Sequence, residues 1–151
     1  RDLAARERVR QMIRQMARKR ATQADPREAH VAAMIAYLRE SLITAGEDDE
    51  RFHAIFLDCR NAYLGDAAFG TGCGPSLSLR MRELFGRALD LGAAGIVVAH
   101  NHPSGLCRPS DTDIAATRRL SAVGAALDIR LLDHLVITRD AVFSMRAGGL
   151  V

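Results

Sequence analysis

The pattern of apolar and polar positions divides the chain into a helical N-terminal part and a part of mixed structure. Residues 1–20 carry apolar side chains at helical spacing among many arginines. A second helix is expected to begin at Asp25 and Pro26, because aspartate is a common N-cap and proline is favoured at the first helical position. We therefore predict a basic helical segment over residues 1–46 and a separate domain over residues 47–151. The expected apolar stripe of the second helix consists of Val31, Met34, Ile35, Leu38 and Leu42.

From Phe52 onward, short apolar runs alternate with turns and with helical patterns. The run of residues 96–99 is wholly apolar, as is typical of a central buried strand. The helix expected over residues 78–91 has Leu89 on its apolar side. In chain order we predict a strand over 52–58, a strand ending near Gly70, a helix over 78–91, a strand over 96–99, a helix over 111–127, and strands over 129–138 and 142–144. This order predicts an α/β (α+β) fold, in which a mixed β-sheet is flanked by helices and preceded by an N-terminal helical extension.

The composition is that of an ordinary globular chain. Of its 151 residues, 48% are hydrophobic and 26% are charged, which argues against disorder and against a coiled coil. No apolar run reaches the roughly 18 residues of a membrane helix, and no export signal is recognisable. The 3 cysteines lack CxxC spacing, which favours a reducing cytoplasm over a disulfide framework. We therefore expect a cytoplasmic protein without a membrane partner.

Positive charge is concentrated at the N-terminus. The net charge is +3, but residues 1–20 hold eight basic and two acidic side chains and so carry +6, which leaves −3 for the remainder. DNA or an acidic protein could bind this basic segment, and a solvated helix face is the alternative interpretation. The rest of the chain has no basic excess and gives no indication of nucleic-acid binding.

The residues that indicate chemistry follow directly on the apolar run. His100 and His102 leave the end of the predicted strand two positions apart, so both imidazoles point to one face and can converge on a metal ion. Pro103 and Gly105 turn the chain away from the sheet, which allows the next helix to bring Asp113 back towards the histidines. Two imidazoles and one carboxylate form an open site with room for water, and zinc makes bound water acidic enough to attack near neutral pH.

Each part of this pattern has a plainer explanation. A His-x-His pair alone is a weak signal for a metal. The stretch from Ser110 to Asp113 is similar to a capping box, in which Ser110 caps the helix and Asp113 bonds back to it. A capping serine is also compatible with an enzyme, so both interpretations stay open.

The spacing His-x-His-Pro-x6-Ser-x2-Asp resembles the JAMM motif of MPN-type metalloproteases. The string over residues 98–105 is similar to the RadC branch of that family, and the resemblance extends from about Glu50 to the C-terminus. It implies a RadC-like JAMM/MPN-type zinc metalloprotease domain with the cytidine-deaminase-like MPN/JAB fold. The motif positions are His100, His102, Pro103, Ser110 and Asp113.

The resemblance also implies roles for particular residues. Glu50 corresponds to the glutamate that precedes the first strand and acts as acid and base, and Glu47 is the nearest alternative. Ser110 would donate a hydrogen bond to the oxyanion. Asn101 and Ser104 would orient the loop around the metal, although turn chemistry explains these two residues equally well.

The implied metal ligands are His100, His102 and Asp113, and the implied cofactor is zinc. The activity would be hydrolysis of an amide in a peptide or protein substrate, including an isopeptide bond to a ubiquitin-like protein. The alternatives are a DNA-associated protein related to repair or mobile elements, with the same metal used as a nuclease, and a catalytically silent binding module. His134 is interpreted either as support for the metal site or as a hydrogen-bonded core histidine. The sequence leaves the oligomeric state open.

Overall fold

The computed structural model describes residues 4, 7–8, 10–11, 26–43, 49–69 and 77–151. Most of the predicted helix over residues 1–20 lies outside these described residues, as does the expected cap Asp25. The elements are α2 (Pro26–Leu42), β1 (Phe52–Leu57), β2 (Tyr63–Phe69), α3 (Leu77–Asp90), β3 (Gly95–Asn101), α4 (Asp111–Ala126), β4 (Arg130–Ile137) and β5 (Val142–Ser144).

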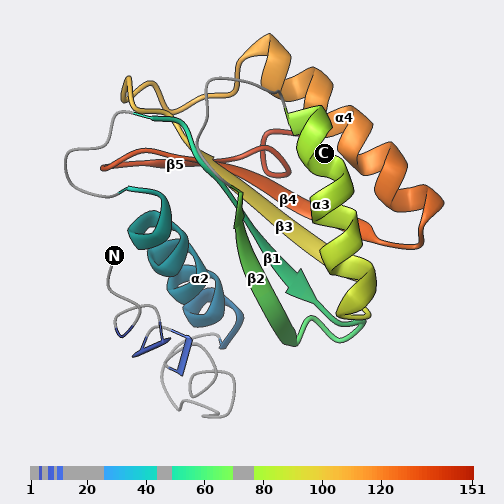
Figure 1. Cartoon of the computed structure of the whole chain (residues 1–151). Helices are drawn as coiled ribbons and strands as arrows, with labels where there is room; N and C mark the ends of the chain where they lie inside the picture. The colour runs from blue at the N-terminus through green and yellow to red at the C-terminus, as the bar shows by residue number, and fades with distance from the viewer. Residues whose placement is uncertain (1–3, 5–6, 9, 12–25, 44–48, 70–76) are drawn as a thin grey trace.

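The strands form one mixed sheet of five strands in the order β2-β1-β3-β4-β5 (Figure 1). Strands β3 and β4 are parallel, and every other neighbouring pair is antiparallel. The parallel pair requires a crossover connection, which α4 supplies. The predicted fold class, a mixed sheet flanked by helices, is therefore confirmed.

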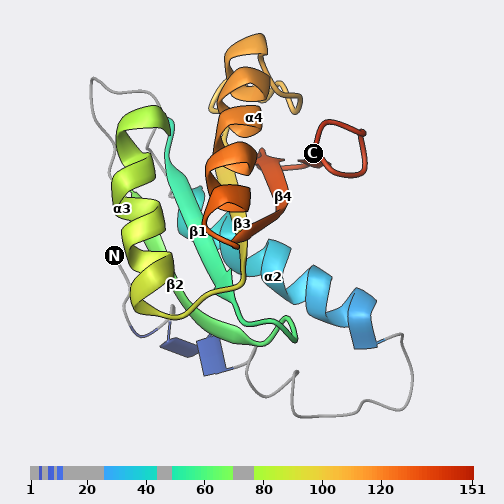
Figure 2. The same ribbon diagram turned by 90° about the vertical axis from the view of Figure 1, so that its right-hand side faces the viewer.

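Helices cover both faces of this sheet. Helix α2 lies on one face, and α3 and α4 pack side by side on the other (Figures 1 and 2). Alternate residues of β3 enter the two cores, since Ile96 and Val98 belong to the α3/α4 side whereas Val97 and Ala99 belong to the α2 side. Burial on both faces explains why this strand is wholly apolar in sequence, as predicted.

The helices bury narrower faces than their sequences suggest. In α2, Leu38 and Leu42 are buried as predicted, but Val31 is 47% exposed, because the buried part of the described side chains begins at Ala33. The prediction for α3 also failed at one position. Leu89 is 57% exposed, since the core face runs from Leu84 to Phe85 and Ala88, and Leu89 falls beyond its edge at 3.6 residues per turn.

The predicted boundary between residues 46 and 47 stays a prediction. Helix α2 nevertheless contacts β1 and β3 and contributes buried side chains to the core. Farther upstream, the Arg10 side chain bonds to Asp66 of β2, with 3.1 Å between Nε and Oδ1. No helix among the described residues is long and apolar enough to cross a membrane.

Candidate metal centre

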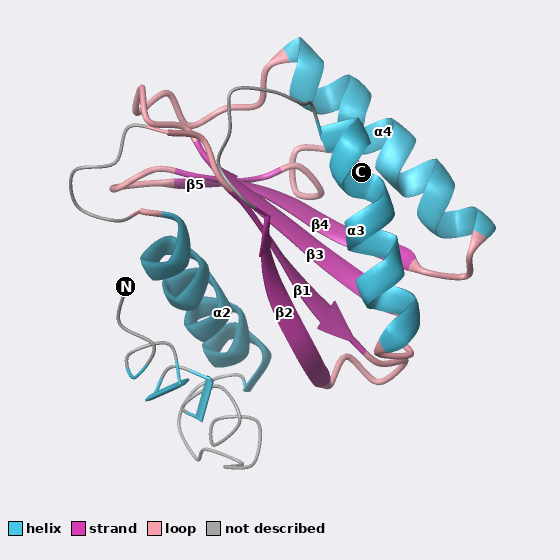
Figure 3. Ribbon diagram, in the orientation of Figure 1, coloured by secondary structure: helices cyan, strands magenta, loops and turns pink. Residues whose placement is uncertain are grey.

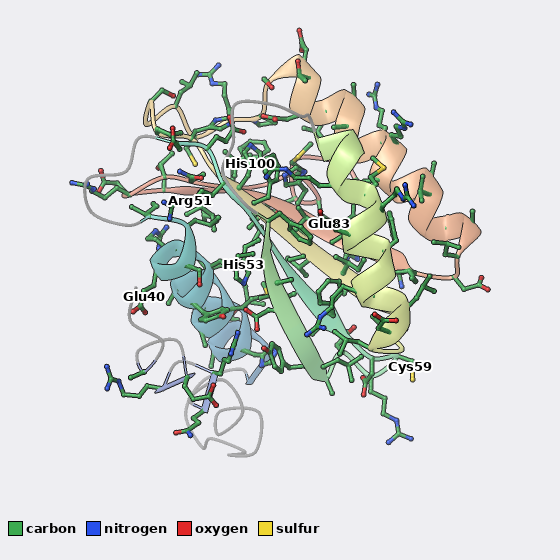
Figure 4. The ribbon with its side chains drawn as sticks, in the orientation of Figure 1. Glu40, Arg51, His53, Cys59, Glu83 and His100 are labelled. Atoms are coloured by element: carbon green, nitrogen blue, oxygen red, sulfur yellow. The ribbon has the colours of Figure 1, made fainter. Side chains whose placement is uncertain are left out.

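Strand β3 places the two histidines of the motif at its C-terminal end. The strand is longer than predicted and includes His100, which is fully buried between Phe52 of β1 and Val136 of β4 in the sheet register. The Phe52 ring stacks on the imidazole at 5.1 Å between centroids. His102 follows the strand, and its Nε2 lies 2.9 Å from Nε2 of His100. The prediction that both rings share one face is therefore confirmed. Figure 4 labels His100 in the sheet.

The loop from β3 to α4 is drawn in pink in Figure 3. Its hydrogen bonds fix the orientation of His102. Gly105 has φ +82°, a left-handed conformation that favours glycine, and its N–H donates to the carbonyl of His102 at 3.0 Å. The carbonyl of Leu106 lies 2.9 Å from Nδ1 of His102. A carbonyl oxygen only accepts, so Nδ1 donates, and Nε2 is the ring nitrogen that faces the site.

Helix α4 brings the aspartate back to the histidines. Its N-cap is Ser110, and the capping box with Asp113 is present in full. Asp113 Oδ2 accepts from the Ser110 N–H at 2.9 Å, yet the same oxygen lies 3.2 Å from Nε2 of His102 and 3.3 Å from Nε2 of His100. The capping box does not compete with the metal-site geometry, because the bond to Ser110 aims the carboxylate at the imidazoles.

Glu50 completes the group from the segment before β1. Its Oε1 lies 3.6 Å from Nε2 of His100, and its side chain is 47% exposed. Asn101, which is buried, holds the backbone on both sides of Glu50: Oδ1 accepts from the Arg51 N–H at 2.6 Å, and Nδ2 donates to the Asp49 carbonyl at 3.1 Å. The side chain of Asn101 thus positions Glu50 rather than its own loop.

The four side chains could hold a metal ion. One ligand atom from each of Glu50, His100, His102 and Asp113 lies within 4.8 Å of the others. The Ser110 N–H donates to the Asp113 carboxylate at 2.9 Å, which favours the ionised form. An aspartate is ionised at neutral pH, as a metal ligand must be.

The group opens on one side into a cavity of about 540 Å³, lined by Glu50, His102, Leu106, Ser110 and Asp113 among others. The Ser110 hydroxyl accepts from the Asp113 N–H at 3.0 Å, which leaves its own proton free to donate. A ligand entering the cavity would thus meet a carboxylate, a hydroxyl donor and the metal-binding atoms together.

Ser104 and Cys107, which also lie in the loop from β3 to α4, are not part of the metal-binding group. Ser104 accepts from the Leu106 N–H at 3.3 Å, a turn contact that fits the plainer of its two interpretations. Cys107 donates to the Val136 carbonyl at 3.4 Å and is not part of the metal-binding group.

His134 matters more than its sequence position suggests. The residue is fully buried on β4, and its Nε2 lies 2.7 Å from Nδ1 of His100. It is therefore a hydrogen-bonded core histidine and also a neighbour of the site. Burial, reinforced by the nearby His100, lowers the pKa of His134 to about 3, so that the ring is neutral. In the sequence, His134 stood out as a histidine beside Asp133 near the start of a predicted strand.

Known proteins resemble the chain over most of its length. A profile of the RadC-like JAB domain matches residues 28–150. A UPF0758 protein of Acidithiobacillus ferrooxidans is 42% identical over 100 residues, which cover 66% of this chain and 45% of that protein. UPF0758 proteins of Nitrosospira multiformis and Cupriavidus pinatubonensis are each 39% identical, over 77% and 78% of this chain and 51% of their own lengths.

The chain belongs to the RadC-like JAB domain family, as its motif predicted. It spans about half the length of the curated relatives it matches. The family, the fold and the potential metal-binding group are thus in agreement.

Proposed function

We propose that the chain is a zinc-dependent metallohydrolase that cleaves amide bonds, as a peptidase or isopeptidase. The observation that carries the proposal is the convergence of Glu50, His100, His102 and Asp113 within 4.8 Å beside an open cavity. Three of these residues are the ligand types of an open zinc site, and the fourth is the half-exposed carboxylate that hydrolysis needs.

The donor set favours zinc. Two imidazole nitrogens and one carboxylate suit zinc better than magnesium or calcium, which prefer oxygen ligands alone. His100, His102 and Asp113 would hold the ion. When bound, zinc would supply a Lewis acid that polarises the substrate carbonyl and lowers the pKa of a water molecule.

Glu50 is the proposed acid and base. Its carboxylate lies on the open side of the group, and Asn101 fixes the backbone on either side of it. It would take a proton from the attacking water and deliver one to the leaving amine. Ser110 would donate its free hydroxyl proton to the oxygen of the carbonyl under attack.

The apolar part of the cavity lining supports a peptide or protein substrate. Leu106 is 55% exposed, and together with Pro103 and Pro109 it forms an apolar wall beside the metal-binding atoms. Such a wall suits a segment of peptide or protein, including the tail of a ubiquitin-like protein. DNA binding through residues 1–20 stays a prediction, because most of that segment lies outside the described residues.

The proposal is tested by hydrolysis. The probe is a mixture of quenched fluorescent peptides with α-linked and lysine-ε-linked amides, incubated with the zinc-loaded chain. Glu50→Gln should retain zinc and lose at least about 100-fold in rate, because it removes the acid and base without removing a ligand of the ion. Glu40→Gln, an exposed change on α2, should have no effect. Full activity of Glu50→Gln, or a zinc-loaded parent chain that cleaves neither class of amide, would contradict the proposal.

A further inference from the structure

A chain of hydrogen bonds runs from His100 into the core and returns to α4. His100 Nδ1 lies 2.7 Å from Nε2 of His134, and Nδ1 of His134 lies 2.6 Å from the Thr117 hydroxyl. That hydroxyl lies 2.6 Å from the carbonyl of Asp113. His100, His134 and Thr117 are all buried, so water does not substitute for any of these partners.

The direction of every hydrogen bond in this chain is fixed by the bond that ends on the carbonyl of Asp113. The carbonyl of Asp113 only accepts, so the Thr117 hydroxyl donates its single proton to that carbonyl. Thr117 must then accept from His134, which therefore carries its proton on Nδ1. His134 is fully buried, and a ring with its one proton on Nδ1 has only a lone pair on the other nitrogen, so Nε2 accepts from Nδ1–H of His100. His100 is left with an unprotonated Nε2.

This unprotonated atom is the one that faces the metal-binding group. Nε2 of His100 lies 2.9 Å from Nε2 of His102, 3.3 Å from Asp113 Oδ2 and 3.6 Å from Glu50 Oε1. If every proton were on the other nitrogen, the Thr117 hydroxyl would face two acceptors, the Asp113 carbonyl and Nδ1 of His134, with only one proton to donate. Nε2 of His100 would then carry an N–H. A proton on that nitrogen would block its use as a ligand.

We propose that Thr117 and His134 are positioning residues that hold His100 in the Nδ1–H tautomer, so that Nε2 is always presented to the metal. This inference rests on the proposed zinc site. His102 is held in the same tautomer directly by the carbonyl of Leu106. His100 is fully buried in the sheet, and its Nδ1 contacts His134 rather than a loop carbonyl. The relay formed by His134 and Thr117 ends on the carbonyl of Asp113, itself a proposed ligand. The relay thereby couples two ligands of one ion, in the manner of hydrogen-bond partners that orient metal-binding histidines.

The tautomer of His100 is measured in the metal-free chain from the ¹⁵N signals of its ring, at about pH 8 where an ordinary imidazole is neutral. The parent chain should show a proton on Nδ1 and none on Nε2. Thr117→Val removes the hydroxyl with little change of shape and should leave His100 in a mixture of tautomers. Thr112→Val makes the same change at an exposed position of α4 and should leave the tautomer unchanged.

Zinc affinity, from competition with a chelator, supplies the second readout. It should fall by about 10–100-fold in Thr117→Val and remain at the parent value in Thr112→Val. His134→Gln should bind zinc better than His134→Leu, because an amide can both accept from His100 and donate to Thr117. Circular dichroism of each variant confirms folding, and Thr117→Val carries the test if His134→Leu unfolds.

Two results would overturn the proposal: a proton on Nε2 of His100 in the metal-free parent chain, or a Thr117→Val variant that keeps both the tautomer and the zinc affinity. These outcomes are distinct from failure of the zinc site. A parent chain with the expected tautomer that takes up no zinc would contradict the proposed function and leave the orientation of His100 intact.

Discussion

Asp66 on β2 is a buried carboxylate that contacts side chains from several elements. It lies between the sheet and α2, where Tyr37, Tyr63 and Arg10 donate hydrogen bonds to it and His53 Nε2 lies 2.6 Å from Oδ2. Figure 4 shows His53 on the side of the sheet nearer α2. Burial alone would raise the pKa of Asp66, but the hydrogen bonds from His53 and the two tyrosines hold it well below its ordinary value of 3.8. The folded state therefore favours the ionised form.

Asp66→Asn should lower the free energy of unfolding at pH 7 by about 2 kcal/mol, because buried donors lose an ionised acceptor. The depressed folded-state pKa stabilises the parent chain at pH values above the unfolded pKa, and this stabilisation is lost as pH falls below about 4. The difference between parent and variant should therefore shrink from pH 7 to pH 3, as measured by urea unfolding. Asp140→Asn, an exposed change between β4 and β5, is the control. A constant difference across that range would contradict this account of Asp66.

Single residues were predictable from sequence where spacing alone sets their position. His100 and His102 share a face because they are two positions apart at a strand end, and Asp113 returns because a turn precedes its helix. The contacts of Asn101 and His134 were not predictable, because Asn101 bonds to the segment before β1 and His134 contacts β3 and α4. Only the family resemblance indicated Glu50. The register between β1 and β3 places this residue beside the histidines, and local spacing in the sequence does not reveal that register.

The start of helix α4 contains both a helix cap and a proposed metal ligand. Ser110 caps the helix, and its partner Asp113 is a proposed ligand. Ser110→Ala should lower the free energy of unfolding by about 1 kcal/mol, which lowers Tm by about 2–4 °C. Ser110→Asn should restore most of that loss, because asparagine is an equally good cap.

The measurement is thermal unfolding of the metal-free chains by circular dichroism, which keeps the cap separate from metal binding. Equal Tm values for the parent chain and Ser110→Ala would show that the cap does not stabilise α4. A Ser110→Asn variant as unstable as Ser110→Ala would assign the loss to the hydroxyl itself rather than to the capping bond.

Elements were easier to predict than their exposed faces. Periodicity located all three described helices and all five described strands to within a few residues of their observed ends. It failed at Val31 and Leu89, because period indicates an apolar side but not how far the sheet beneath extends. Strand pairing explains the end of β3: it pairs with β1 as far as His100 and with β4 as far as Asn101, past the apolar run that marked the strand in sequence.

At the scale of the whole molecule, the sheet assembles a site from distant parts of the chain. Glu50 precedes β1, the histidines end β3, and Asp113 begins α4, so no local segment contains the complete group. The parallel pairing of β3 with β4 adds His134 beneath the site. Metal binding is therefore expected to require the folded chain, and a bound ion should stabilise that fold by mass action.

The central claim is that the folded chain binds zinc through His100, His102 and Asp113. The most direct measurement is the metal content of the purified protein by plasma mass spectrometry, before and after zinc is added back and excess is removed. The parent chain should hold about one zinc per chain, and Asp113→Ala should hold little. Asp111→Ala removes an exposed aspartate from the same helical turn and should bind zinc like the parent. A parent chain without metal even after addition of zinc, or equal zinc in Asp113→Ala, would contradict the claim.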